Sequence, residues 1–110
     1  MGFIAPTKAE AKERWFAGWE RMFKAIGQIR GWSSPSRAEY DVMVEAPGAY
    51  YVGSPDDIAE RIVDLHRHLG HMRHFLQMDL GGLPQEQFLE SITLLATEVK
   101  PRVERLLRRL

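Results

Sequence analysis

A chain of 110 residues has room for one domain with a single hydrophobic core. Its 15 Lys and Arg residues balance its 15 Asp and Glu residues, so the formal net charge is zero. Nucleic-acid-binding proteins normally carry a basic excess that neutralises phosphates, so we expect no nucleic-acid partner. The sequence contains no cysteine, which excludes disulfides and thiolate metal sites and is consistent with a cytoplasmic protein.

The sequence shows no sign of a membrane or secretory segment. No apolar run approaches the ~20 residues that a membrane span needs, so we expect no membrane partner. The N-terminal segment lacks a basic region followed by an apolar core, so it does not resemble a signal peptide. A basic cluster near the C-terminus is interpreted as cations that complement a helix dipole rather than as a binding patch: Arg102, Arg105, Arg108 and Arg109.

Residues 8–30 show a helical repeat of apolar side chains. The apolar residues at three- and four-residue steps are Trp15, Trp19, Met22, Ile26 and Ile29, with Phe16 and Phe23 beside them. Thr7 and Glu10 have the spacing of a capping box, in which each side chain bonds to the backbone amide of the other residue. Gly31 is the natural end of this predicted helix, because glycine adopts the left-handed conformation without strain.

Serine and proline mark residues 32–47 as a loop. Within this loop, Ser36 is suited to cap one short helical turn over residues 37–43. Residues 49–52 (Ala-Tyr-Tyr-Val) form a short β-prone run that ends at Gly53. We therefore expect a short strand after the loop.

The strongest local signal is the start of a second helix. Ser54 is suited to cap it, Pro55 has the backbone angle that the first helical position needs, and Asp56 and Asp57 face the positive end of the helix dipole. The residues on one face of this helix are Ile58, Ile62, Leu65 and Leu69. Gly70 is expected to end it.

The segment His74–Met78 is interpreted as a strand that ends before Gly81 and Gly82. Pro84 opens the last predicted helix, whose apolar residues keep a near-heptad spacing: Phe88, Ile92, Leu95, Val99, Val103, Leu106 and Leu110. Pro101 lies inside this pattern, so the helix either kinks there or a new turn begins.

The predicted order is helix, loop, short strand, helix, strand, helix. A strand, a helical crossover of about a dozen residues and a second strand form a βαβ unit, which is normally right-handed with parallel strands. We therefore expect a single α/β domain over residues 1–110. It should be predominantly helical, with one or two short parallel strands and three main helices.

Several groups of side chains suggest chemistry but have a simpler structural interpretation. The four histidines lack the spacing of a known metal motif, so we interpret them as solvated and expect no metal site. They are His66, His68, His71 and His74. The acidic side chains that follow Ser54 are explained by their place in a first helical turn. The tryptophans are interpreted as core or interface residues rather than as a stacking platform for a flavin or for bases.

Two glycine-containing segments are candidate binding sites. Gly53 and Ser54 join a strand to a helix N-terminus, where exposed amides and the helix dipole favour an anion. Asp79, Gly81 and Gly82 follow the predicted strand, and ligands of parallel α/β proteins gather at the carboxyl ends of strands. A double glycine also lets a ligand approach the backbone closely.

The chain resembles one known family along most of its length. Residues 53–62 (GSPDDIAERI) resemble the GSPE-x-VAE-x-I segment of the luciferase-like, flavin-dependent monooxygenases. Residues 69–84, which include Phe-Leu-Gln-Met-Asp-Leu-Gly-Gly-Leu-Pro, resemble the last barrel strand and its exit, and residues 91–103 resemble the closing helix. At the front, residues 2–5 and 29–32 are similar to the segment after the sixth barrel strand.

The resemblance implies a TIM barrel that uses reduced FMN and oxygen to oxidise aldehydes or other small organic molecules. It also implies that Asp79, Gly81 and Gly82 line the mouth of the barrel near the flavin, with Gly53 and Ser54 as further cofactor-binding residues. It identifies no catalytic residue in this chain.

This chain corresponds only to the last third of such a barrel, a fold that takes about 250 residues. In the family, most flavin contacts and the substrate pocket come from upstream parts. His74 also separates Arg73 from Phe75, where the family runs Arg-Phe directly, and this insertion shifts the strand register by a residue. Bare strand edges and uncovered helix faces favour self-association, most simply as a two-fold dimer.

Two functions of different classes follow. The first is an FMN-dependent monooxygenase of the luciferase-like family, of which this chain is the C-terminal part. The alternative is a non-catalytic remnant that forms a structural oligomer, and the missing upstream strands favour it for the isolated chain. A third arrangement is a subunit that a separate chain completes.

Overall fold

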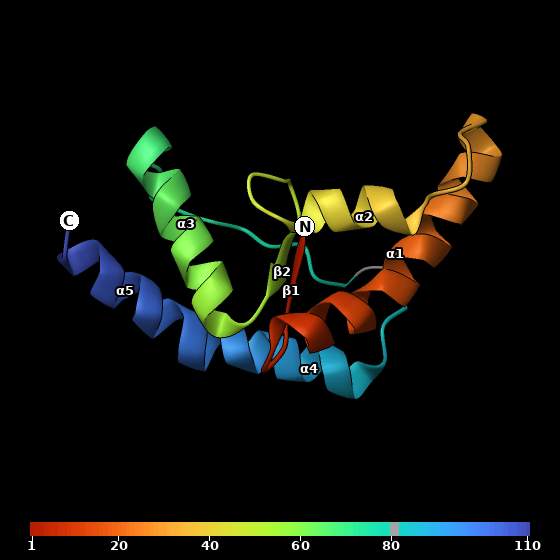
Figure 1. Ribbon diagram of the computed structural model, residues 1–110. Helices are drawn as coiled ribbons and strands as arrows, with labels where there is room; N and C mark the ends of the chain where they lie inside the picture. The colour runs from red at the N-terminus through yellow and green to blue at the C-terminus, as the bar shows by residue number, and fades with distance from the viewer. Residues whose placement is uncertain (80–81) are drawn as a thin grey trace.

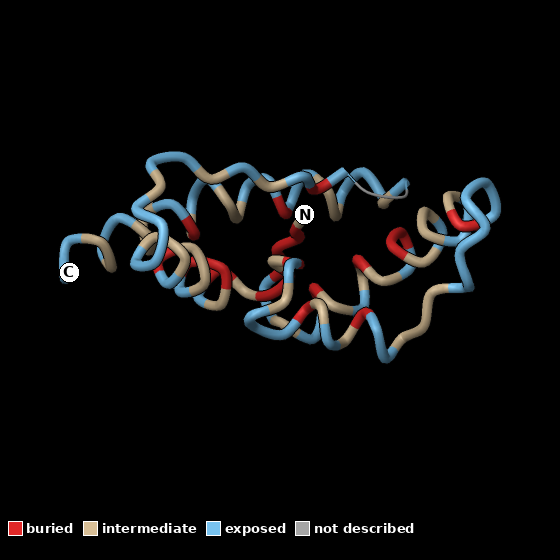
Figure 2. Tube along the Cα trace, turned by 90° about the horizontal axis from the view of Figure 1, so that it is seen from above, coloured by how far each residue is buried: buried red, intermediate tan, exposed pale blue. Residues whose placement is uncertain are grey.

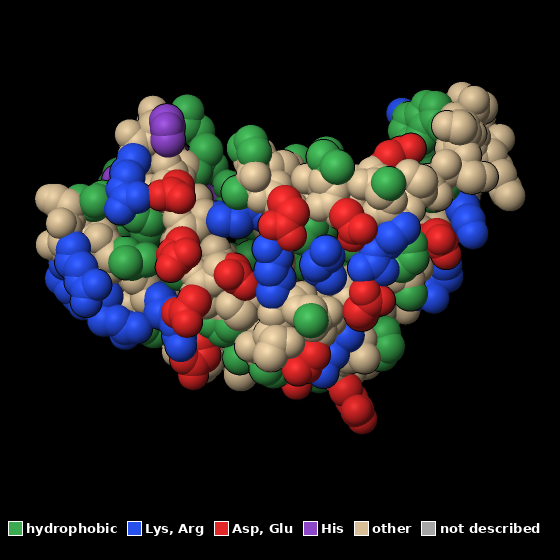
Figure 3. Space-filling view, in the orientation of Figure 1, with side chains coloured by type: hydrophobic (Ala, Val, Ile, Leu, Met, Phe, Trp, Pro, Cys, Tyr) green, Lys and Arg blue, Asp and Glu red, His purple; other side chains and the backbone are tan. Residues whose placement is uncertain are grey.

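The computed structural model describes residues 1–79 and 82–110, which form a mostly helical body of 46 × 31 × 22 Å (Figure 1). Its elements in chain order are β1 (Gly2–Ile4), α1 (Lys8–Arg30), α2 (Arg37–Val44), β2 (Tyr51–Gly53), α3 (Pro55–Leu69), α4 (Gln85–Leu94), the π-helical segment η1 (Leu95–Val99) and α5 (Lys100–Arg108). Both ends of the body rise above its middle in the space-filling view (Figure 3).

The sheet consists of β1 and β2, which run parallel with Gly2 opposite Tyr51 and Ile4 opposite Gly53. The helical crossover between them consists of α1 and α2. The predicted βαβ unit, with α3 as its crossover and residues 74–78 as its second strand, does not form among the described residues. A different βαβ unit forms earlier in the chain, with β1 and β2 as its strands. β1 has only three residues, which is too short for a period-two pattern, so no strand was predicted there.

The predicted strand over His74–Met78 is wrong. This segment forms no ladder of backbone hydrogen bonds with either strand. It contacts the sheet through one backbone hydrogen bond, in which the Gly2 amide donates to the Gln77 carbonyl at 3.0 Å. The Ile4 amide, two residues further along the same strand edge, donates to the Ser91 hydroxyl at 2.8 Å. Because a side chain from α4 takes this amide, the ladder along β1 cannot continue.

The ends of α1 and α3 follow the predicted cap signals. The Thr7 hydroxyl accepts from the Glu10 amide at 3.2 Å, but the Glu10 carboxylate binds Arg14 and so does not complete the predicted capping box. Gly31 ends α1 with φ of 72°, and Gly70 ends α3 with φ of 63°. These left-handed conformations explain the glycine at both positions.

Two other boundaries differ from the prediction. The predicted single helical turn over residues 37–43 is the eight-residue helix α2, capped by Ser36. The β-prone run at residues 49–52 starts to pair only at Tyr51. Tyr50 instead donates its amide to the Met43 carbonyl at 3.0 Å, which ties the entrance of β2 to the end of α2.

The last helix passes Pro101 without ending. The segment η1 connects α4 to α5 directly, so the backbone widens into π-helical geometry on the N-terminal side of the proline. Proline has no amide hydrogen, and its ring clashes with the carbonyl four residues earlier, here that of Thr97. A single π-helical turn relieves this conflict within a continuous helix.

The sheet separates two hydrophobic clusters, because successive strand residues point to opposite faces. Phe3 packs against α1 and α2 and Ile4 against the opposite helices, and Figure 2 shows buried residues on the inward sides of the helices. The aromatic cluster contains Phe3, Trp15, Trp19, Tyr40 and Tyr50, together with Ala5, Ala11, Val44 and Val52. The aliphatic cluster contains Ile4, Ile58, Ala59, Met78 and Val99.

Arg61 of α3 forms hydrogen bonds to the connection between α2 and β2. Its guanidinium donates to the carbonyl of Val44 at 2.9 Å and to the carbonyls of Gly48 and Tyr50. It also lies 4.4 Å from the ring centroid of Tyr51, and burial lowers the pKa of Arg61. One side chain of α3 thereby satisfies the last carbonyl of α2 and two carbonyls of the connection that follows it.

Candidate functional site

The predicted anion site at the N-terminus of α3 is filled by a side chain of the same helix. One oxygen of the Asp57 carboxylate, Oδ2, accepts from the Ser54 amide at 2.9 Å and from the Ser54 hydroxyl at 2.8 Å. The Ser54 hydroxyl in turn accepts from the Asp57 amide at 3.3 Å, which completes a capping box. A Cβ on Gly53 would lie 2.8 Å from the Asp57 Cβ, so this glycine makes room for Asp57.

This arrangement tests whether a cofactor phosphate fits at Gly53 and Ser54. A phosphate at a helix N-terminus binds the free backbone amides there. Here the Asp57 carboxylate already accepts from Ser54, and its negative charge would repel a phosphate. The residues as arranged therefore do not fit the phosphate of FMN.

The second predicted site lies at a different helix. Asp79 and Gly82 are exposed, Gly82 has φ of 71°, and its carbonyl accepts from the Arg21 guanidinium of α1 at 3.3 Å. Gly81 lies outside the described residues. The two predicted cofactor segments are thus held by different elements, with Gly53 and Ser54 at α3 and Gly82 at α1. Their roles as cofactor-binding residues stay predictions.

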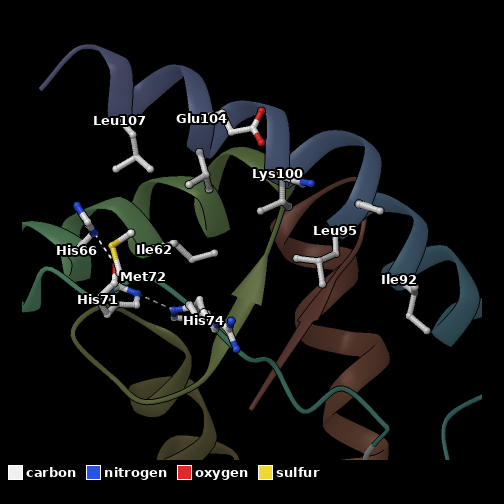
Figure 4. Close-up of a pocket in the computed structure, with 14 residues that line it drawn as sticks. Ile62, His66, His71, Met72, His74, Ile92, Leu95, Lys100, Glu104 and Leu107 are labelled. Carbon is white, nitrogen blue, oxygen red and sulfur yellow. Dashed lines mark hydrogen bonds between the residues drawn. The ribbon is translucent and has the colours of Figure 1, made fainter.

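A groove of about 520 Å³ lies between α3, residues 71–74 and the long helix formed by α4, η1 and α5 (Figure 4). Ligand pockets typically measure about 300–1,000 Å³ and are largely apolar. The apolar side chains along the groove are Ile62, Met72, Ile92, Leu95, Val99, Val103 and Leu107. The sequence identified most of them as one helical face but could not show that this face stays partly open.

Three of the four histidines line this groove, although the sequence suggested isolated solvated side chains. His66 Nδ1 lies 2.8 Å from the His71 carbonyl, and His71 Nε2 lies 3.2 Å from His74 Nδ1 (Figure 4). The ring of His74 lies 5.0 Å from that of Tyr51. The reversal of the chain at Gly70 brings these rings together, and no helical spacing reveals it.

The chemistry of the histidines is limited by their surroundings. Burial lowers the pKa of His74, and the nearby His71 and N-terminal amine lower it further. Imidazole that stays neutral is a possible metal ligand. Across residues 1–79 and 82–110, however, no three His, Cys, Asp or Glu side chains are grouped so as to hold a metal ion.

Two charged residues at the groove lack the ion pairs that many other charged side chains of the surface form. On the face shown in Figure 3, acidic and basic side chains intermingle over the middle of the body. On α5, Arg102 binds Asp56 at 2.7 Å and Glu98 at 2.6 Å. Lys100 and Glu104 line the groove on the same helix, and neither makes an ion pair with any other residue in the described ranges.

Comparisons with protein-family models and with curated proteins give no match. Within the described ranges, no helix is both long enough and apolar enough to cross a membrane. The resemblance to the luciferase-like monooxygenases therefore stays a prediction from the residues.

Proposed function

We propose that this chain is a non-catalytic, self-associating protein related to the C-terminal part of a luciferase-like flavin-dependent monooxygenase. It retains a parallel strand pair joined by a helical crossover, which is the repeating unit of a TIM barrel. Its own side chains bind the outer edge of β1 and the N-terminus of α3, which a complete barrel would use for a neighbouring strand and for the cofactor phosphate. This combination favours a structural role over flavin chemistry.

The observation that carries the proposal is the closed outer edge of β1. Consecutive strands of a TIM barrel are neighbours, so a strand at residues 74–78 would lie beside β2. Instead, its Gln77 carbonyl accepts from Gly2 of β1, and Ser91 accepts from Ile4 on the same edge. The segment therefore closes the two-stranded sheet at the edge opposite to the one a barrel would extend.

The second support is the Asp57 carboxylate at the N-terminus of α3. It satisfies the Ser54 amide that a cofactor phosphate would otherwise bind. A carboxylate fixed in this position makes phosphate binding unfavourable through both competition and repulsion.

A flavin titration tests this proposal. We expect no saturable change in the absorbance of FMN near ~450 nm, and no rise in the melting temperature, when FMN is added to the purified protein. The Asp57→Asn variant, which lacks the negative charge, serves as a comparison for any weak phosphate binding. Saturable binding of FMN by the unaltered protein at micromolar concentrations would show that the proposal is wrong.

A second candidate is an FMN-dependent monooxygenase subunit, completed by another chain and acting on a small organic substrate. The outer edge of β2 favours it. Tyr51 and Gly53 face β1, so the backbone of Val52 faces away from it, and no residue in the described ranges pairs with Val52 at that edge through a backbone hydrogen bond. An added strand from a second chain would pair there. Saturable FMN binding in the titration would favour this candidate.

A further inference from the structure

The groove carries two opposite charges that the chain itself does not use. Lys100 and Glu104 lie one turn apart on α5, at a spacing at which Lys and Glu commonly pair. Neither side chain makes an ion pair with the other or with any other described residue. Both line the groove from α5, where Figure 4 labels them.

Exposed apolar side chains line the groove or follow its residues in the chain. Met72 at the rim of the groove is 91% exposed, and Phe75, three residues further on, is 84% exposed. Ile92 at the other end of the groove is 41% exposed. A groove edged by exposed apolar residues is typical of a surface that binds a partner.

We propose that a second copy of this chain covers the groove, with the α5 helices of the two copies antiparallel across a two-fold axis. A two-fold axis between Lys100 and Glu104 brings Lys100 opposite Glu104 of the partner subunit. The same operation brings Glu104 opposite Lys100 of the partner subunit, because an isologous interface repeats every contact. One unpaired cation and one unpaired anion thus become two reciprocal ion pairs.

The charge pattern selects this occupant. A surface with one positive and one negative group a helical turn apart is complementary to its own copy in the antiparallel orientation. Val103, which lies beside this axis and lines the groove, then packs against Val103 of the second copy. This inference rests on the self-association in the proposed function and names the surface that performs it.

Charge reversal tests the interface, with sedimentation velocity as the measurement. We expect the unaltered protein to be a dimer at micromolar concentrations. Lys100→Glu and Glu104→Lys should each weaken the dimer by about tenfold or more, because each places two like-charge pairs across the axis. An equimolar mixture of the two variants should again dimerise, since one copy then carries two acidic groups and the other two basic groups.

The matched controls lie on α1, where Lys24 and Glu20 form an exposed pair at 3.6 Å with the same four-residue spacing. Lys24→Glu and Glu20→Lys make the same charge changes away from the groove, so they should leave the dimer unaffected. Circular dichroism verifies that every variant is folded. A monomeric unaltered protein, or a dimer that both groove reversals leave intact, overturns the inference.

The outcome is independent of the flavin titration. A protein that binds no FMN and stays monomeric contradicts the dimer while leaving the absence of catalysis in place. A dimer that follows the charge rules but binds FMN supports this interface and contradicts the non-catalytic proposal.

Discussion

The aromatic cluster and the groove lie on opposite faces of the same two-stranded sheet and are built from different side chains. In the aromatic cluster, Trp15 meets Tyr50 edge to face at 5.3 Å between ring centroids. The polar atoms of Trp19 and Tyr40 are paired, since Trp19 Nε1 donates to the Tyr50 hydroxyl at 3.0 Å and the Tyr40 hydroxyl donates to the Lys12 carbonyl at 2.7 Å. On the other face, aliphatic side chains leave a groove of about 520 Å³.

The difference shows how the two faces divide stability and binding. Each large ring buries about 150–250 Å² and fills its space at a low cost in side-chain entropy. The aliphatic side chains of α3 and of the long helix, in contrast, leave the space between the two helices partly open. We therefore expect the aromatic cluster to provide most of the unfolding free energy, and the groove to provide surface for a partner.

The largest effect should come from removing the centre of the aromatic cluster. Trp15 is fully buried, so Trp15→Ala should lower the unfolding free energy by about 3–5 kcal/mol, as measured by urea denaturation. Trp15→Phe should cost less, because it keeps a ring and removes an indole N–H that has no hydrogen-bond partner in the structure. Trp32→Ala is the control, since Trp32 is 49% exposed and its loss should matter little. Equal losses of unfolding free energy for Trp15→Ala and Trp32→Ala would contradict the expectation that the aromatic cluster provides most of the stability.

The next effect tests the bond that joins the edge of β1 to α4. Ser91→Ala removes the acceptor for the Ile4 amide and leaves a buried N–H without a partner. The expected loss is about 1–3 kcal/mol of unfolding free energy, together with faster hydrogen exchange at Ile4. Ser34→Ala, in an exposed loop, is the control and should change the unfolding free energy by less than about 0.5 kcal/mol. Unchanged exchange at Ile4 would exclude this role for Ser91.

A smaller effect concerns the helix that forms one wall of the groove. Ser54→Ala should cost about 1 kcal/mol, because the hydroxyl that accepts from the Asp57 amide is lost. Ser54→Gly should cost only a few tenths of a kcal/mol, since glycine is itself a tolerated cap. Chemical denaturation of the two variants gives the comparison. Should Ser54→Gly prove the more damaging, the cap interpretation would be wrong.

The smallest effect is a pH dependence confined to the groove. Burial, His71 and the N-terminal amine hold the pKa of His74 below its usual value of 6.5, so the folded state disfavours the protonated imidazole. Neutral His74 therefore stabilises the folded state fully above pH 6.5, and this stabilisation is lost as the pH falls through the lowered pKa of His74. His74→Phe should flatten the change in urea midpoint between about pH 7.5 and pH 5.5. A variant that keeps the full pH dependence would rule out His74 as its source.

Local signals in the sequence predicted much of the fold. The caps at Thr7 and Ser54 and the glycine ends at Gly31 and Gly70 mark α1 and α3 correctly, because they depend on a few neighbouring residues. The structural interpretation of the tryptophans agrees with the burial of Trp15 and Trp19.

Features that depend on distant residues were not predictable in this way. A strand over His74–Met78 requires a free edge of β1, and the Ser91 hydroxyl of α4, which comes later in the chain, occupies that edge. The groove depends on which helix faces remain uncovered, and the periodicity of one helix does not reveal that. The same limit applies to the histidines, whose proximity follows from the path of the chain after Gly70.

The bond between Ser91 and Ile4 also has a consequence for the order of folding. It spans 87 residues, so the first strand of the chain is completed by one of its last helices. Contacts of such long range form slowly, because a long loop must close before any stabilisation is gained. During synthesis, β1 therefore leaves the ribosome long before α4, and its outer edge stays uncovered in that interval.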